Sequence, residues 1–171
     1  MLDGLAVLCL ISAIALLIAL SLIDLRTRLL PNKLVLPFAI CAPIFHTATS
    51  WQFLSWEMVL LGGISGYALL YALRVIANYV YKQDALGLGD VKLMGAAGLW
   101  LGPENLMMAL TLGATAGLLH GIAVAVYIAQ KERRPPVFKG LKIPAGPGFA
   151  IGIVLTGLYM FKSFTPWELW G

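Results

Sequence analysis

Charged residues are scarce in this chain of 171 residues, at 12% of the sequence. A soluble domain averages about 25% charged residues. The chain is also 60% hydrophobic, and its mean hydropathy is +0.88. The shortage of charge therefore excludes an ordinary soluble domain and indicates a protein that resides in the lipid bilayer.

Metal-ligating residues are equally few. Cys9 and Cys41 lie in different apolar runs and form no CxxC motif, and His46 and His120 each stand alone in an apolar run. Zinc sites need clustered ligands, so we expect no metal, and we expect no nucleotide or other cofactor. We interpret the cysteines as small buried apolar residues. The histidines are interpreted as interhelical hydrogen-bonding or packing residues.

The first apolar run, Gly4 to Ile23, lacks the basic region that opens a secretory signal, and it exceeds the usual apolar core of ~7–15 residues. We therefore interpret it as a retained span. The apolar runs predict an all-α fold, a single domain over 1–171 with a bundle of about six transmembrane helices. The fourth predicted helix, Val91–Leu101, is short, and it either begins nearer Gly87 or ends inside the protein. The predicted helices are Leu5–Ile23, Leu34–Ser50, Met58–Tyr81, Val91–Leu101, Leu106–Ala129 and Gly146–Phe161.

Basic residues are distributed unevenly over the predicted connections. Eleven of the twelve Lys and Arg residues fall on one side of the bundle, and only Lys162 falls on the other. The positive-inside rule makes the basic side cytoplasmic and places both termini on the non-cytoplasmic side. The basic charge thus indicates a topology in the lipid bilayer, and we expect no nucleic-acid partner.

Glycines recur at small-xxx-small spacing in several of these runs, a pattern that lets helices approach closely in lipid. We interpret them as packing residues. The pairs are Gly62/Gly66, Gly98/Gly102, Gly113/Gly117/Gly121 and Gly148/Gly152.

Apart from Glu132, which stands in a basic run and is expected to be solvated, three acidic residues fall on the basic side. Asp24 ends the first apolar run, directly after IALLIALSLI, and Asp90 in GLGDVK opens the fourth. These two are expected at the same depth. Asp84, in YKQD, is expected to be solvated. Taken alone, Asp90 is explained as a helix N-cap, and Asp24 as an ordinary interfacial residue.

A different chemistry follows if the fold brings Asp24 and Asp90 together. Two close carboxyl groups share one proton. The ionised group can activate a water that attacks a peptide carbonyl, while the protonated group donates to the developing oxyanion. Gly87 and Gly89 would let a substrate strand approach the backbone beside Asp90.

Three segments resemble the type IV prepilin peptidases. GLGDVKLMGAAGLWLG, at 87–102, resembles their GxGD segment, and IDLRTRLLPNKLVLP, at 23–37, resembles their first aspartate segment. KIPAGPGFAIG, at 142–152, resembles their C-terminal proline–glycine segment. They occur in family order, and the resemblance covers essentially the whole chain. It implies a membrane aspartic endopeptidase whose catalytic pair is Asp24 and Asp90.

The same resemblance implies a substrate and a location. Such enzymes cut a short basic leader from prepilin or pseudopilin precursors at the cytoplasmic face of the inner membrane, which they cross several times. Larger relatives also methylate the new N-terminus and carry paired CxxC motifs, so we expect peptidase but no methyltransferase activity here. Gly87, Gly89 and Lys92 are candidates for substrate binding or motif support. Lys92 could orient Asp90 or extend its amine to the interface.

Two other classes stay open at this point. A non-enzymatic membrane assembly factor or a small transporter would share the composition, but a transporter more naturally places ionisable groups near the midplane. A GxGD protease of the presenilin type normally has a YD pair at its first aspartate. Ile23 precedes Asp24 here, which disfavours that type.

Overall fold

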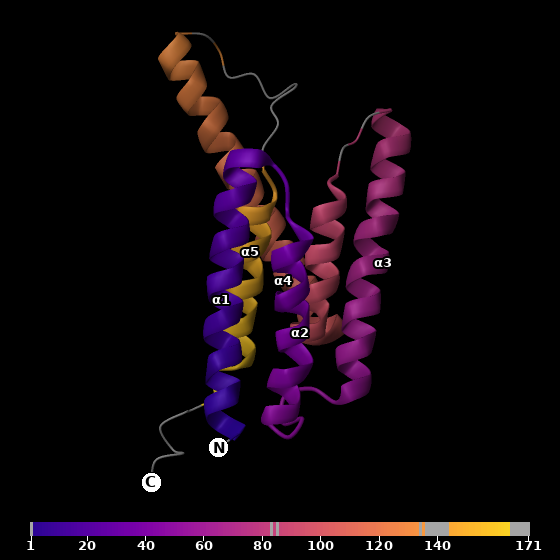
Figure 1. Ribbon diagram of the computed structural model, residues 1–171. Coiled ribbons are helices and arrows are strands. Elements are labelled where there is room, and N and C mark those ends of the chain that lie inside the picture. Colours follow the sequence, from indigo (N-terminus) through magenta and orange to yellow (C-terminus); the bar gives the residue numbers. More distant parts are fainter. Residues whose placement is uncertain (1, 83, 85, 134, 136–143, 165–171) are drawn as a thin grey trace.

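Five α-helices form the fold in the computed structural model, which describes residues 2–82, 84, 86–133, 135 and 144–164. No strand occurs among these residues, so the all-α prediction is confirmed for them. The helices stand side by side along one common direction (Figure 1). They are α1 (Leu2–Thr27), α2 (Asn32–Ala48), α3 (Trp56–Tyr81), α4 (Leu88–Glu132) and α5 (Gly146–Met160).

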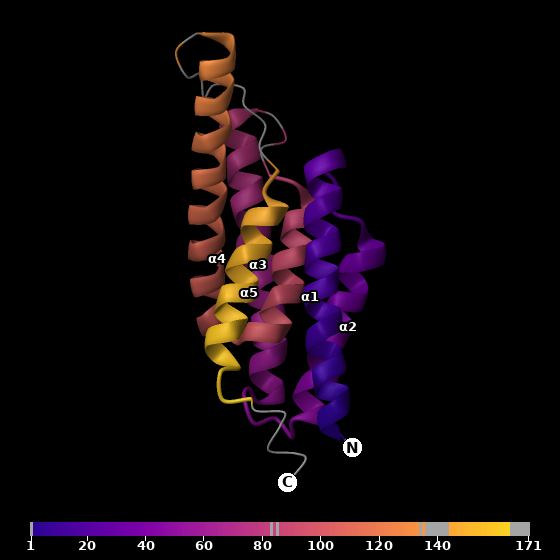
Figure 2. The ribbon, with the colours of Figure 1, turned by 90° about the vertical axis from the view of Figure 1, so that its left-hand side faces the viewer.

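Helix α4 consists of two arms, residues 88–101 and 103–132, which are joined at Gly102. That glycine has φ 70° and ψ 175°, outside the helical range, and Pro103 after it has no N–H to continue the helix. A Cβ built on Gly66 of α3 would lie 2.5 Å from the Met94 carbonyl oxygen and 2.9 Å from Leu106. On a straight helix Met94 and Leu106 would be about 18 Å apart. The chain therefore turns back at Gly102, as Figures 1 and 2 show.

The two arms correspond to the predicted helices Val91–Leu101 and Leu106–Ala129. The first arm begins at Leu88, so the earlier start that the sequence suggested is confirmed. Residues 88–101 span only about 21 Å at 1.5 Å per residue, less than the ~30 Å of hydrocarbon in a bilayer. Most of this arm is enclosed by the other helices. Its buried residues are Val91, Leu93, Met94, Gly95, Ala96, Ala97, Gly98, Trp100 and Leu101.

Glycines allow the helices to contact each other through their backbones. Gly62 of α3 and Gly98 of α4 face each other so closely that a Cβ on either would meet the carbonyl oxygen of the other. A Cβ on Gly148 of α5 would lie 2.8 Å from the Gly113 carbonyl oxygen. The packing interpretation is therefore confirmed for these glycines. Gly117 differs, because a Cβ built on it meets nothing within 4 Å.

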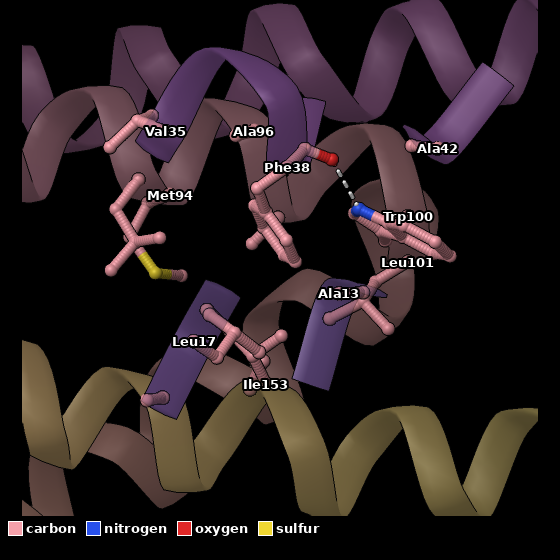
Figure 3. Close-up of a cluster of buried hydrophobic side chains, with 14 of the residues drawn as sticks. Ala13, Leu17, Val35, Phe38, Ala42, Met94, Ala96, Trp100, Leu101 and Ile153 are labelled. Atoms are coloured by element: carbon pink, nitrogen blue, oxygen red, sulfur yellow. Dashed lines mark hydrogen bonds between the residues drawn. The ribbon is translucent and has the colours of Figure 1, made fainter. Parts of the chain in front are cut away.

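Apolar side chains from α1, α2, α4 and α5 meet in the core that Figure 3 shows. Phe38 of α2 stacks on Trp100 of α4, with ring centroids 5.8 Å apart. The Trp100 indole N–H donates to the Phe38 carbonyl oxygen at 2.9 Å. Leu17 of α1 and Ile153 of α5 are buried in the same cluster. The first arm of α4 is thereby fixed against helices from both ends of the sequence.

An aromatic cluster, which we call the aromatic end, lies where α2 and α5 finish. Within it His46 is fully buried, and its Nε2 lies 3.2 Å from the Trp100 carbonyl oxygen. The interhelical role expected for His46 is confirmed. His120 is exposed on the second arm of α4, so the packing interpretation is wrong for it. The cluster consists of Phe45, His46, Trp51, Phe53, Trp100, Phe161 and Phe164.

The two cysteines are closer than the sequence indicated. Cys9 of α1 is buried, Cys41 of α2 is half-buried, and neither is in a disulfide. Their thiols nevertheless lie close enough to interact with each other. Both behave as interior residues, and together they join α1 to α2.

Three of the described helices are long and apolar enough to cross a membrane. They are Gly4–Thr27, Trp56–Tyr81 and Leu88–Glu132. Helix α5 is apolar but shorter, and α2 has 17 residues with two internal prolines. The structure thus confirms a helical protein with membrane-crossing segments, while the number of crossings and their direction stay predictions.

Candidate active site

Asp24 lies in the last turn of α1, which continues past the predicted end at Ile23 as far as Thr27. The side chain is only 5% exposed, and it is the only buried acidic residue among those the structure describes. A buried carboxylate needs hydrogen-bond partners to offset the loss of water. Asp24 Oδ2 accepts a hydrogen bond from the Gly146 backbone N–H at 2.8 Å.

Gly146 supplies this donor from the start of α5. Its N–H is one of the helix's first four, which have no partner within the helix, and helix N-termini favour negative charge. A Cβ at this position would lie 2.7 Å from Asp24 Oδ2. Glycine is thus what allows the carboxylate to reach the amide. The sequence contains Gly146 in its proline–glycine segment, but sequence reasoning did not assign it to the site.

Asp90 lies in the first turn of α4, three residues after the N-cap residue, which is Gly87. The N-cap interpretation of Asp90 is therefore wrong. Its half-buried carboxylate instead reaches back to the Gly87 backbone N–H and interacts with it. This is one half of the capping-box arrangement. A Cβ on Gly87 would lie 2.9 Å from Asp90 Oδ2, so this glycine too leaves room for a carboxylate.

The fold brings Asp24 and Asp90 into one place. Although α1 and α4 are far apart in sequence, the two carboxylates are close enough to repel each other electrostatically. Asp24 also accepts a hydrogen bond from the Gly146 amide, and Asp90 interacts with the Gly87 amide. We call this pair, with Gly87 and Gly146, the carboxylate end. Whether the pair is catalytic remains a prediction.

The other motif residues have structural partners. A Cβ on Gly89 would lie 2.8 Å from Leu30 Cβ, so this glycine lets the α1–α2 connection pack on the first turn of α4. The Lys92 amine donates to the Asn32 side-chain oxygen at 3.1 Å. This contact directs Lys92 toward α2. Neither Leu30 nor Asn32 was identified from sequence, although both lie in the LLPNK stretch.

Asp84 is exposed, as predicted, with a side chain 81% accessible. It also has partners that the sequence did not indicate. Its Oδ1 accepts hydrogen bonds from Arg74 Nη2 at 2.9 Å and from Asn78 Nδ2 at 3.1 Å. Arg74 Nη1 in turn donates to the Leu86 carbonyl oxygen. The segment just before Gly87 is therefore held by a side chain of α3.

Comparisons with known proteins agree with the resemblance to the type IV prepilin peptidases. The model of the type IV leader peptidase family matches residues 11–122, which include both aspartates. Proteins named prepilin leader peptidase/N-methyltransferase are similar to the chain. The one from Aeromonas hydrophila is 31% identical over 90% of this chain and 49% of the relative. The one from Escherichia coli (strain K12) is 30% identical over 84% of this chain and 59% of the relative.

A third such protein, from Dickeya chrysanthemi, is 35% identical over 68% of this chain and 42% of the relative. The chain thus spans about half the length of the curated relatives that it matches. No solved structure matches it. On the extent of the family match, which covers well over half of its residues, the chain belongs to the type IV leader peptidase family.

Proposed function

We propose that this chain is a membrane aspartic endopeptidase and that Asp24 and Asp90 form its catalytic pair. One observation carries the proposal. A buried carboxylate on α1 lies close enough to a second carboxylate on α4 for the two to repel each other. Placing two like charges together is costly, so a purely structural role explains the arrangement poorly.

The reaction follows from the shared proton that such a pair holds. The ionised carboxylate takes a proton from water as the water oxygen bonds to the peptide carbonyl carbon, and the protonated partner donates to the carbonyl oxygen. In the second step the C–N bond breaks. The newly protonated carboxyl gives its proton to the departing nitrogen, and its partner recovers a proton from the hydroxyl group. The pair thereby returns to its starting state.

The glycine amides prepare the pair for this chemistry. The Gly146 N–H holds Asp24 at 2.8 Å, and the Gly87 N–H holds Asp90. Catalytic groups held in place before substrate binds need no reorganisation during the reaction. Because glycine has no side chain, each carboxylate can lie directly against the backbone of its glycine.

The proposed substrates are type IV prepilin or pseudopilin precursors, from which the enzyme would remove a short basic leader. The similar proteins are named for this activity. The position of the pair also suits it, since Asp24 lies where α1 ends and Asp90 where α4 begins. Such a site can reach a peptide bond that lies just outside a membrane-spanning apolar segment.

We further propose six crossings of the inner membrane, with the carboxylate end on the cytoplasmic side and both termini outside. The charge distribution supports this orientation. Eight of the nine described Lys and Arg residues lie at the helix ends nearest the pair, and Lys162 alone follows α5 at the opposite end. The eight are Arg26, Arg28, Lys33, Arg74, Lys82, Lys92, Lys131 and Arg133.

Single cysteines would test the orientation, placed in a background where Cys9 and Cys41 are alanine. In intact cells a membrane-impermeant maleimide should label Lys162→Cys. It should label Arg133→Cys, at the end of α4, only after the membrane is permeabilised. The reverse pattern would invert the proposed topology.

The activity is tested by Asp24→Asn and Asp90→Asn, each nearly isosteric. Each change removes a titrating carboxyl, so each should reduce cleavage of a precursor by ~10²–10⁴-fold. The double variant should be little worse than either, because groups that act as a unit are not additive. Glu57→Gln, an exposed carboxyl at the start of α3, is the control and should retain activity. Full cleavage by Asp24→Asn would exclude the pair.

A further inference from the structure

We infer that Arg74 is a positioning residue for Asp90, and that it acts through the peptide group between Leu86 and Gly87. The inference rests on the proposed catalytic role of Asp90. It assigns a function to a basic residue of α3 that lies outside the GLGDVK motif and that the cleavage mechanism above does not use.

The Arg74 guanidinium group contacts the segment before α4 at two points. Arg74 Nη1 donates to the Leu86 carbonyl oxygen, and Arg74 Nη2 donates to Asp84 Oδ1 at 2.9 Å. Two donors of one rigid, planar group thus hold two points of the segment that leads into α4. The Arg74 side chain is 22% accessible, so it is mostly covered by protein.

Peptide planarity transmits the contact at Leu86 to Gly87. The Leu86 carbonyl and the Gly87 N–H belong to the same peptide group, whose atoms lie in one plane. Fixing the oxygen therefore fixes the direction of the N–H. That N–H interacts with the Asp90 carboxylate, whose Oδ2 lies against Gly87. Arg74 thereby sets the direction of the N–H that faces Asp90, without touching Asp90 itself.

The charge of Arg74 adds to this effect. Hydrogen bonds in a chain polarise one another. A cation at the carbonyl oxygen draws electron density from the peptide group, so its N–H becomes a better donor to the carboxylate on the other side. A neutral side chain of similar length would donate a weaker hydrogen bond to the Leu86 carbonyl oxygen. It would not polarise the peptide group.

Asp84 and Asn78 contribute less than Arg74 to the position of Asp90. Asp84 accepts from both Arg74 and Asn78, but its side chain is largely exposed. Exposed ion pairs contribute little energy, so Asp84 mainly orients the guanidinium. The amide oxygen of Asp84→Asn can still accept both hydrogen bonds. We therefore expect Asp84→Asn to lower kcat much less than Arg74→Gln does.

A bracing role or a substrate-binding role for Arg74 would give different results. If Arg74 only braces the loop, its removal should lower the amount or thermal stability of the folded protein and leave kcat of the folded enzyme intact. If Arg74 instead contacts the substrate, its removal should raise KM. Binding of a basic leader by a cation is unfavourable by charge, and the positioning role predicts a fall in kcat.

The experiment compares the purified full chain with Arg74→Gln, Arg74→Lys, Asp84→Asn and Lys82→Gln, using a prepilin precursor. Arg74→Gln should lower kcat about 10–100-fold, the scale of a misplaced catalytic group, with KM and the unfolding temperature little changed. Arg74→Lys should recover part of this, since an ammonium can still donate to Leu86. Lys82→Gln removes a neighbouring exposed cation and should have no effect. A rise in KM alone, or unchanged kinetics for Arg74→Gln, would overturn the inference.

A second measurement does not need activity. With ¹⁵N-glycine labelling, the Gly87 amide resonance is identified by its loss in Gly87→Ala. Its proton should shift upfield in Asp90→Asn, which weakens the acceptor, and also in Arg74→Gln. A shift in Asp90→Asn without one in Arg74→Gln would refute the coupling. Absence of cleavage by the wild-type chain would count against the proposed function, whereas the two shifts test Arg74 alone.

Discussion

The two ends of the bundle are held together by opposite means. At the aromatic end the Phe45 ring packs against five others, with centroids 4.8–5.9 Å apart, which belong to His46, Phe53, Trp100, Phe161 and Phe164. At the carboxylate end, Asp24 and Asp90 are held by backbone amides of glycine. One end is filled with large side chains, and the other depends on positions that have none.

This difference separates stability from activity. Aromatic packing stabilises a fold through contact area and ring geometry, so substitutions there should lower the free energy of unfolding. Two neighbouring carboxylates repel each other, so the carboxylate end adds little to stability. Its glycines instead determine where the carboxylates lie. Substitutions at the two ends should therefore affect different measurements.

Among the substitutions that compare the two ends of the bundle, the largest effect on activity is expected for Gly146→Ala. The new Cβ would lie 2.7 Å from Asp24 Oδ2, closer than real Cβ contacts allow. The carboxylate must turn away and lose its N–H partner. Displacement of a catalytic group by about 1 Å can cost ~10²-fold, so we expect a loss of that order in kcat/KM for precursor cleavage, at nearly unchanged unfolding temperature.

Gly117→Ala is the matched control for that change. It also places an alanine in a helix, but its Cβ meets nothing within 4 Å. It should leave cleavage unchanged and, because alanine favours helix over glycine, leave stability equal or slightly higher. Equal activity of the two alanine variants would mean that Gly146 does not set the position of Asp24.

Phe45→Ala should have the opposite profile. The side chain is fully buried, and removal of a buried phenylalanine ring typically costs about 3–5 kcal/mol. Thermal unfolding in detergent should show this loss, while the fraction that stays folded should cleave at the wild-type rate. Tyr79→Ala changes a residue that is 84% exposed, and it should alter neither the unfolding temperature nor the cleavage rate. A fall in kcat at unchanged stability would show that the two ends are coupled.

A smaller effect is expected for Trp100→Phe. The substitution keeps an aromatic ring beside Phe38 but removes the indole N–H that donates to the Phe38 carbonyl oxygen at 2.9 Å. A typical hydrogen bond contributes about 1 kcal/mol, and the unfolding free energy should fall by roughly that amount. Trp56→Phe, at an exposed position, is the comparison and should have no effect on stability. A loss as large as that of Phe45→Ala would assign Trp100 a larger packing role.

Much of the helical framework could be predicted from sequence, because apolar runs report burial or contact with lipid directly. The reversal at Gly102 falls between two predicted helices, where glycine and proline together end the first arm. The end of α1 was placed too early, at Ile23. A hydropathy pattern stops at the first charged residue, whereas the helix continues through Asp24 because that carboxylate finds a partner inside the protein.

The site could be predicted only in part, and for a physical reason. Asp24 and Asp90 are recognisable because carboxylates beside apolar runs are rare. Their partners are backbone amides of Gly146 and Gly87, and every residue type except proline carries such a group. The contact of Arg74 with the Leu86 carbonyl oxygen is hidden in the same way. Only the folded arrangement reveals which amides and carbonyls are used.

The smallest effect is expected for Lys92, the motif residue whose role the sequence left open. Its amine donates to the Asn32 side-chain oxygen, and isolated polar contacts at a partly exposed position contribute about 1 kcal/mol or less. Lys92→Gln can still donate a hydrogen bond toward α2, so cleavage should stay within about twofold of wild type and unfolding should be nearly unchanged. Asn32→Ala removes the same contact from the other side and should match it. If Lys92→Gln lost ~10²-fold in kcat while Asn32→Ala did not, Lys92 would act on Asp90 rather than on α2, and the carboxylate end would include a cation.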